Sequence, residues 1–498
     1  MDLLDQLVMG FGVALTLQNF LYCLLGAVLG TLVGVLPGLG PVTVIAMLLP
    51  ITFKIPAVAS LIMLSGIYYG AHHAGSTTAI MLNMPGEPSS VVICIDGYPM
   101  ARKGRAGAAL CISAIGSFIA GCISIVIIAL FSPALSNAAL LFGAPEYASM
   151  IIMALVTGSV LSNGSLLTTL AMAVVGLLVG TVGTDTDSAI GRFTFGSNHL
   201  ADGIDFVAVA VGLFAFAEVI QHIATPELRA KVEFKISGLL PKRQDLKDSF
   251  WPILRGTGLG AALGILPGTG PLVASFASYA MEKQLAKDPS RFGEGAIEGV
   301  AGPESANNAA ALTHFIPMLG LGIPAGPAMA LLLGALTIQG IRPGPQVMTE
   351  HADLFWGVVA SMWIGNMMLL VLNLPMVGIW IRLLTIPYRL IYPAVLLFCC
   401  IGVYSVRNSA FDVLLAAGFG LIGCVFKQFN CSPAPLVLGL VLGPMLEDSF
   451  RRSLLISGGD PGIFLTRPIS AVLLVSTVLL VVLFFASGLK RRSAVAAH

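Results

Sequence analysis

Charged side chains are scarce in this chain. Only 10% of its 498 residues are Asp, Glu, Lys or Arg, whereas 56% are hydrophobic. A soluble domain carries about 25% charged residues, so these few polar groups could not cover a globular surface. The composition therefore predicts an integral membrane protein in contact with the lipid bilayer. The net charge of +1 gives no bulk attraction to nucleic acid, and we expect no nucleic-acid partner.

Several motifs of catalysis are missing as well. The chain contains no GxxxxGK[ST] phosphate loop, no HExxH and no GxSxG, which argues against ATP-driven transport and against hydrolase chemistry. Its eight cysteines form no CxxC pair, so neither a metal site nor a disulfide framework is indicated. We expect no enzyme, no cofactor and no metal beyond a possible Na+. An intramembrane enzyme built on a His/Glu or His/Asp pair and a channel are the weaker interpretations, since no ring of charges marks a pore.

The first fifteen residues contain no Lys or Arg. They therefore lack the basic start of a signal peptide, and we expect a short interfacial helix that leads into the first span. Many apolar runs approach the ~20 residues that cross the hydrocarbon core. The last of them, Pro468–Gly488, is followed by Lys490, Arg491 and Arg492.

One sixteen-residue stretch occurs twice. Gly26–Pro41 and Gly256–Pro271 are identical at nine positions, and each ends in Pro-Gly-x-Gly-Pro within an apolar run. A second break rich in Gly, Pro and polar residues follows in each half, at Gly70–Pro88 and Gly302–Pro327. Paired, broken hydrophobic segments indicate the binding site of a transporter. Two unrelated Gly/Pro loops are the alternative, but the second break recurs at nearly the same offset.

These breaks divide the chain into three parts. We assign residues 1–224 to a first transmembrane repeat, 225–255 to a charged cytoplasmic linker and 256–498 to a second transmembrane repeat. The predicted fold is an all-α polytopic membrane protein with two inverted structural repeats, whose broken or re-entrant helices meet at mid-membrane. The residues that break the first helix of each repeat are Pro37, Gly38, Gly40, Pro267, Gly268 and Gly270.

Basic residues in the loops indicate that the repeats are inverted. The loop at 52–56 has one Lys, whereas its counterpart at 282–298 has three basic residues. After the second breaks the bias reverses, from three basic residues at 102–105 to Arg342 alone. Short cytoplasmic loops carry excess Lys and Arg, so corresponding loops belong on opposite sides. The linker and C-terminus are then cytoplasmic and the N-terminus periplasmic, while the number of crossings in the C-terminal third stays open.

Polar residues of the second breaks are the candidate substrate and ion sites. Helix N-termini favour anions, and free carbonyls with Ser, Thr and Asn oxygens favour Na+. In the first half the candidates are Ser76, Thr77, Thr78, Asn83 and Gly86, and in the second half Glu304, Ser305, Asn307, Asn308 and Gly322, with Thr313 beside them. A neutral polar site can hold a multiply charged anion if co-bound cations compensate it, which points to cation-coupled uptake of an organic anion. Helix capping is an equally consistent role for any one of these residues.

Ionisable residues also fall within the breaks. A carboxylate inside the membrane costs roughly 3 kcal/mol or more unless it is paired or hydrated. We place Glu87 in a wet vestibule and leave Glu304 open between cation binding, proton carriage and the same vestibule. His72, His73 and His314 are selectivity candidates that could donate to substrate carboxylates or respond to pH. The alternative is that they bind freed backbone carbonyls.

Seven motifs occur in one order from about residue 20 to past residue 330: GVLPGLGP, GSTTAIMLNMPGEPSS, DGYPMARKGRAG, RFTFGSNHLADGIDF, GILPGTGP, GPESANNAA and LGIPAGP. Together they resemble the large membrane subunit of the bacterial tripartite tricarboxylate transporters. The resemblance implies a permease of the bacterial inner membrane that works with a small four-span membrane subunit and a periplasmic solute-binding protein, which delivers a di- or tricarboxylate. It also implies that an ion gradient, with Na+ as the expected ion, drives uptake.

The chain departs from that family pattern at three histidines. His72 and His73 stand where an aromatic residue or Gly is usual, and His314 replaces a small residue. We therefore expect a carboxylate other than citrate. A stand-alone ion-coupled carboxylate permease that needs no binding protein is the alternative to the tripartite reading.

Overall fold

The computed structural model describes residues 3–36, 40–139, 142–160, 165–185, 188–224, 241–266, 270–344, 346–383 and 388–495. Within these ranges the chain is almost entirely helical, and its only strands form one short ribbon. Four described helices are long and apolar enough to cross a membrane: Leu17–Val35, Ala106–Ser132, Ala352–Asn373 and Ala410–Gln428. The protein is thus an all-α polytopic membrane protein, as its composition predicts.

Up to Ala224 the described elements are α1 (Leu3–Ala14), α2 (Leu17–Val35), α3 (Pro41–Thr52), α4 (Ala57–Leu82), η1 (Pro88–Ser90), α5 (Val91–Arg102), α6 (Ala106–Ala139), α7 (Ala144–Val160), α8 (Leu166–Gly180), β1 (Gly183–Thr184), β2 (Gly191–Arg192), η2 (Asn198–Leu200), α9 (Phe206–Ala210), the π-helical η3 (Val211–Phe216) and α10 (Ala217–Ala224). They are followed by α11 (Arg243–Ile265), α12 (Gly270–Leu285), η4 (Pro289–Arg291), α13 (Glu298–Thr313), α14 (Phe315–Leu321), α15 (Pro327–Ile338), α16 (Gln346–Glu350), α17 (Ala352–Asn373), α18 (Val377–Leu383), α19 (Tyr388–Arg407), α20 (Ala410–Gln428), α21 (Ala434–Ile456), α22 (Ile463–Thr466) and α23 (Pro468–Val495).

Two segments of the chain contain the same order of elements. In the first, α2 and α3 precede α4, which ends at Asn83, and Pro88 then begins η1. In the second, α11 and α12 precede α13 and α14, which end at Gly322, and Pro327 begins α15. Asn83 and Gly322 both have the left-handed conformation, with φ of 56° and 72°, which Gly and Asn adopt most readily at a helix end. Each segment therefore has its second break at the corresponding place.

Glycines bring the first helix of each segment into backbone contact with a neighbour. A Cβ at any of three α2 glycines would overlap carbonyl oxygens of α4, and a Cβ at the three corresponding α11 glycines would overlap those of α13. These residues are Gly26, Gly30 and Gly34 on α2, and Gly256, Gly260 and Gly264 on α11. Small residues four positions apart permit such close packing of membrane helices. The duplicated stretch is therefore a helix-packing surface as well as a break.

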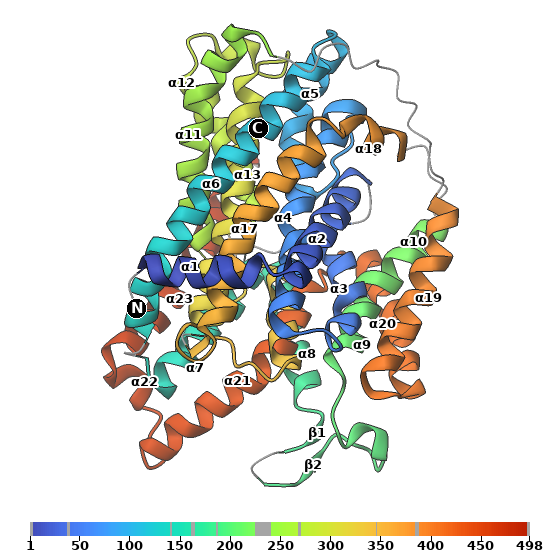
Figure 1. Ribbon diagram of the computed structural model, residues 1–498. Helices are drawn as coiled ribbons and strands as arrows, with labels where there is room; N and C mark the ends of the chain where they lie inside the picture. Colours follow the sequence, from blue (N-terminus) through green and yellow to red (C-terminus); the bar gives the residue numbers. More distant parts are fainter. Residues whose placement is uncertain are drawn as a thin grey trace.

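Loops of the two segments meet at both ends of the molecule. After α5, Lys103 pairs with Glu294 of the α12–α13 loop at 3.5 Å, and Arg105 pairs with Asp245 of α11. At the opposite end, Gln339 after α15 donates to the carbonyl oxygens of Thr52, the last residue of α3, and of Ile55 in the α3–α4 loop. Figure 1 shows α5, α11 and α12 together at the end away from the β1–β2 ribbon. Corresponding loops thus lie at opposite ends, as antiparallel halves require, while their inversion across a membrane stays a prediction.

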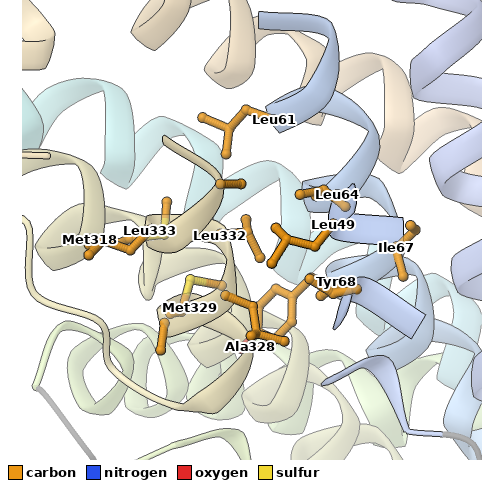
Figure 2. Close-up of a cluster of buried hydrophobic side chains, with 14 of the residues drawn as sticks. Leu49, Leu61, Leu64, Ile67, Tyr68, Met318, Ala328, Met329, Leu332 and Leu333 are labelled. Atoms are coloured by element: carbon orange, nitrogen blue, oxygen red, sulfur yellow. The ribbon is translucent and has the colours of Figure 1, made fainter. Parts of the chain in front are cut away.

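An apolar cluster fills the space between the segments. Figure 2 shows Leu49 of α3 and Leu64 of α4 facing Met329 and Leu332 of α15, all of them buried. Helices in lipid associate through this kind of dense van der Waals packing. Tyr68, at the edge of the cluster, is where the apolar core meets the polar site described below.

The second breaks are shorter than the sequence indicates. Helix α4 continues through the polar stretch that was predicted to interrupt it. Helices α13 and α14 together cover most of the second predicted break, so that only 83–87 and 322–326 are clearly non-helical. Gly, Ser and Thr are weak helix formers in water. Here they are buried against neighbouring helices, and a buried backbone must satisfy its own hydrogen bonds, which favours the helix.

The motif DGYPMARKGRAG at residues 96–107 is also largely helical, because α5 runs to Arg102 and α6 begins at Ala106. Asp96 on this helix is fully buried. Its Oδ1 accepts backbone N–H groups of Gly293, Gly295 and Ala296 at 2.7–2.9 Å, and its Oδ2 accepts the Tyr279 hydroxyl at 2.9 Å. A carboxylate with this many donors is stable when buried, so Asp96 secures α5 to the α12–α13 loop.

The division at residues 224 and 255 stays a prediction. Residues 225–240 lie outside the described ranges, and α11 begins at Arg243. Helix formation therefore starts inside the stretch assigned to the linker.

Candidate functional site

Polar side chains gather where α4, η1 and α6 of the first segment meet α13 of the second. Helix α4 packs against the three glycines of α2, and α13 packs against the three corresponding glycines of α11. Twelve side chains here are at most 5% exposed: Tyr68, His72, His73, Ser76, Glu87, Ser89, Ser113, Ser117, Glu304, Asn307, Asn308 and His314. Their polar atoms must therefore be satisfied by one another or by a ligand.

The first group, which we name the His72–Glu87 network, starts from an ion pair. His72 Nδ1 lies 3.1 Å from Glu87 Oε2. Glu87 caps the N-terminus of η1, where Pro88 occupies the first helical position and Ser90 closes a capping box, and this local geometry turns the carboxylate towards α4. Ser89 donates to Glu87 Oε1. The GEPSS sequence thus folds so that one acid faces one histidine.

Asn307 connects this network to the second segment. Its Nδ2 donates to Glu87 Oε1 at 3.2 Å and to the His72 carbonyl at 3.4 Å, and its Oδ1 lies 2.6 Å from the Ser89 hydroxyl oxygen. One side chain of α13 therefore contacts three residues of α4 and η1. Separation of α13 from α4 and η1 would break these bonds.

Two further rings extend the network along α4. Tyr68 Oη lies 3.0 Å from His314 Nδ1, at the junction of α13 and α14. The Tyr68 ring also meets the His72 ring edge-on, with centroids 4.7 Å apart. His314 Nε2 and His73 Nε2 are buried and have no hydrogen-bond partner among the described residues. Each segment thus contributes one buried imidazole nitrogen without a described partner.

The second group, which we name the Glu304 network, lies one helical turn from Asn307 on α13. Glu304 Oε1 accepts the Ser117 hydroxyl at 2.8 Å and Asn308 Nδ2 at 3.1 Å, and Asn308 also donates to Ser117 at 2.8 Å. Glu304 Oε2 has no hydrogen-bond partner in the described part of the chain. Nearby on α4, Ser76 shares a hydrogen bond of 2.7 Å with Ser113.

The first-half candidates take different positions. Ser76, Thr77 and Thr78 are buried on α4, and Thr78 donates back to the Gly75 carbonyl at 3.2 Å. Asn83 is exposed and ends α4. A Cβ at Gly86 would overlap the Gly34 carbonyl of α2, so Gly86 fits a close approach of backbones.

The second-half candidates divide in the same way. Ser305 donates to the Ala301 carbonyl at 2.8 Å, and Thr313 to the Ala309 carbonyl at 2.9 Å, so both satisfy their own helix. Gly322 ends α14. The structure therefore brings Glu304, Asn307 and Asn308 into the polar site and leaves the others beside it.

The breaks within the duplicated stretch are only partly described. Gly40 precedes α3, and Gly270, with φ of 53°, begins α12. Pro37, Gly38, Pro267 and Gly268 lie outside the described residues. Their predicted role therefore stays a prediction.

Several residues of the site carry no obvious sequence signal. Ser113 and Ser117 lie in a long apolar helix, where Ser is common and usually bonds its own backbone. Tyr68 reads as part of an apolar run. Ser89 could have been selected, because it follows Glu87 at the start of a helix, where Ser is a frequent cap.

The donor set favours anions and hard monovalent cations. The described residues contain no group of three His, Cys, Asp or Glu side chains placed to hold a metal ion. Hydroxyls, amides and imidazoles can bind carboxylate oxygens, and a single free carboxyl oxygen can bind a cation. An enclosed site of this kind suits the recognition of a small charged solute.

Known proteins similar to this chain give independent evidence of its family. A family model described as "Tripartite tricarboxylate transporter TctA family" matches residues 20–438. A relative from Agrobacterium vitis, an uncharacterized 52.8 kDa protein in the TAR-I ttuC' 3' region, is 54% identical over 474 residues, which cover 95% of this chain and 94% of the relative. A second, an uncharacterized protein in the TAR-II ttuC' 3' region of the same organism, is 58% identical over 215 residues, covering 43% of this chain and 89% of the relative. No solved structure gives a significant match.

Proposed function

Because the chain belongs to the tripartite tricarboxylate transporter TctA family, we propose that it is the large membrane subunit of a binding-protein-dependent secondary active transporter. It imports a di- or tricarboxylate through the bacterial inner membrane and couples this import to an ion gradient, with Na+ as the ion. A small four-span membrane subunit and a periplasmic solute-binding protein are its partners. The binding protein delivers the carboxylate to the periplasmic face.

One observation carries the proposal. The His72–Glu87 network joins side chains of both segments beside the two second breaks, in a site that is enclosed in the described structure. Alternating access needs contacts of this kind, which exist in one state and are exchanged for substrate contacts in another. Hydrogen bonds suit this task, because their net contribution is only about 1 kcal/mol each.

Two histidines supply donors for the substrate. His73 and His314 each have a buried Nε2 atom without a hydrogen-bond partner in the described structure, and an imidazole N–H binds a carboxylate oxygen well. His72 is already paired with Glu87. The selectivity role proposed for the three histidines therefore falls first on His73 and His314, and on His72 only when its pair opens.

The test is uptake of labelled di- and tricarboxylates into liposomes that contain this chain and its small membrane partner. Each assay is run with and without a Na+ gradient, and with and without the solute-binding protein that is its proposed partner. We expect uptake that requires both. Uptake without the binding protein would indicate a stand-alone permease instead of a tripartite transporter. Uptake driven by a proton gradient alone would indicate H+ instead of Na+ as the coupling ion.

The same assay tests selectivity. His73→Ala and His314→Ala should change the ratio of uptake rates between carboxylates of different charge, because each removes one donor. Ser405→Ala, at a half-buried position of α19 outside the site, is the control and should leave the ratio unchanged. An unaltered ratio in both histidine variants would contradict the selectivity role.

A further inference from the structure

Tyr68 lies where the apolar core meets the histidines of the site. Figure 2 shows its side chain among the buried residues of α4 and α15. Two further rings pack against it edge-on, because its ring centroid lies 4.7 Å from that of His72 and 6.1 Å from that of Phe315. The side chain is only 4% exposed. Packing therefore fixes the direction in which the Tyr68 hydroxyl points.

The hydroxyl meets one ring nitrogen of His314. Tyr68 Oη lies 3.0 Å from His314 Nδ1, and neither side chain makes another hydrogen bond within the described part of the chain. His314 is buried, and none of the described carboxylates is bonded to it. A charged imidazole would therefore be buried without compensation, which is strongly unfavourable. His314 is thus neutral and carries its hydrogen on one ring nitrogen only.

The hydrogen bond with Tyr68 distinguishes the two positions of that hydrogen. If Nδ1 carried it, Nδ1 would donate to Oη, and both the phenolic hydrogen and the Nε2 lone pair would lack a partner among the described residues. If Nε2 carries it, Tyr68 donates to Nδ1, and only the Nε2–H group is left over. Buried polar groups without partners are costly, so the second arrangement is favoured. The bond at one ring nitrogen thus decides what the other nitrogen offers.

We propose that Tyr68 is a positioning residue of the site, whose hydroxyl donates to His314 Nδ1 and so holds His314 as the tautomer with an Nε2–H group. This group can only donate. It therefore matches a carboxylate oxygen and has no partner in an ammonium group, which also only donates. The proposal rests on the proposed function, in which His314 binds the substrate carboxylate, and it explains how a neutral imidazole selects an anionic group.

The first measurement is ¹⁵N NMR of the full chain, labelled at histidine and reconstituted in liposomes without any carboxylate. Seven histidines contribute to the spectrum, and the signals that disappear in His314→Gln belong to His314. We expect a hydrogen on Nε2 and none on Nδ1, which NMR distinguishes because protonated and unprotonated ring nitrogens resonate far apart. In Tyr68→Phe, which keeps the ring but loses the donor, the Nδ1 signal should shift.

The second measurement separates this role from packing. Tyr68→Phe should raise the KM for uptake of whichever labelled di- or tricarboxylate the native chain imports fastest by about three- to ten-fold, the effect of one hydrogen bond, and leave the maximal rate nearly unchanged. Gln at position 314 carries an amide N–H that depends on no tautomer. In the His314→Gln background, Tyr68→Phe should therefore change the KM by less than about two-fold.

Tyr69→Phe is the matched control. Tyr69 is the next residue of α4 and is equally buried, but its hydroxyl faces Gly365 of α17 instead of a histidine. The variant should leave both the KM and the spectrum of His314 unchanged.

A hydrogen on His314 Nδ1 of the native chain, alone or together with one on Nε2, would overturn the proposal. A KM that Tyr68→Phe leaves at the native value, or raises by the same factor in both backgrounds, would overturn it too. The NMR result is independent of uptake. A chain in which Tyr68 holds the Nε2–H tautomer but which imports no carboxylate would refute the proposed function and leave the tautomer assignment standing.

Discussion

Glu87 and His72 pair with each other, and the surrounding residues of the site shield both side chains from solvent. Replacing His72 with Ala leaves Glu87 buried without its cation, and we expect a loss of about 3 kcal/mol or more in unfolding free energy. Glu87→Gln keeps a hydrogen-bonding group towards Ser89 and Asn307, so its loss should be smaller. Thermal unfolding in detergent measures both.

The double variant His72→Ala with Glu87→Gln completes the comparison. It should be more stable than His72→Ala alone, because the unpaired charge is gone. A double variant that loses the sum of the two single effects would contradict the ion pair.

Asn307 is the residue through which the second segment contacts the His72–Glu87 network. Asn307→Ala removes its bonds to Glu87, Ser89 and the His72 carbonyl, and we expect carboxylate uptake to fall by about ten-fold or more, equal to the ~1.4 kcal/mol that one or two such bonds contribute. Asn373→Ala is the control, since Asn373 is also buried but donates within α17. Equal uptake by the two variants would show that Asn307 has no special role.

At the scale of elements, the glycine faces determine whether the helix pairs form. Gly260 packs on Ala306 of α13, whereas Gly258, on the same helix, is exposed, and a Cβ added there would meet no atom within 4 Å. Gly260→Val should overpack the interface and lower the free energy of unfolding by about 3 kcal/mol. Gly258→Val should change stability by less than about 1 kcal/mol.

Size-exclusion profiles and unfolding midpoints of the two valine variants make this comparison. If Gly260→Val and Gly258→Val were both folded and equally stable, α11 and α13 would not be in contact at Gly260.

Asp96 performs a different task, which is to hold the α12–α13 loop. Asp96→Ala leaves three backbone N–H groups and the Tyr279 hydroxyl without their acceptor, and amide hydrogen exchange at 293–296 should become at least about ten-fold faster. Asp288→Ala lies in the same loop but caps only the short η4, so exchange at 293–296 should stay as it was. Protection that survives Asp96→Ala would contradict the anchoring role.

The duplicated Gly-Pro stretch could be found in the sequence because its spacing repeats. Asn83 and Gly322 were predicted as substrate or ion sites, and the structure gives both the alternative role of helix capping, with the left-handed backbone that Asn and Gly adopt most readily. The length of α4 was not readable. Its polar second half is helical because other helices surround it. The local sequence does not show which helices will pack there. For the same reason Ser117 could not be distinguished from any serine in an apolar helix, although it binds Glu304.

At the scale of the whole molecule, loop contacts predict which ends share a side of the membrane. The loop that contains Lys103 meets the α12–α13 loop, and the α3–α4 loop meets Gln339, just before Arg342. We expect Arg342→Cys to react with a membrane-impermeant maleimide from the periplasm, and Lys103→Cys only after the membrane is permeabilised. The eight native free cysteines would first be replaced by Ala. Labelling of both positions from one side would contradict the inverted arrangement.

Gly34 has a mechanical consequence. It abuts the Ala71 carbonyl on one side, and its own carbonyl abuts Gly86 on the other. Ala71 precedes His72, and Gly86 precedes Glu87. The residues next to both partners of the ion pair therefore contact the same residue of α2, Gly34. A contact between two backbones is rigid, because no side chain can change its rotamer to accommodate a shift. A displacement at the end of α2, just before the duplicated break, is therefore transmitted directly to the distance between the acid and its histidine.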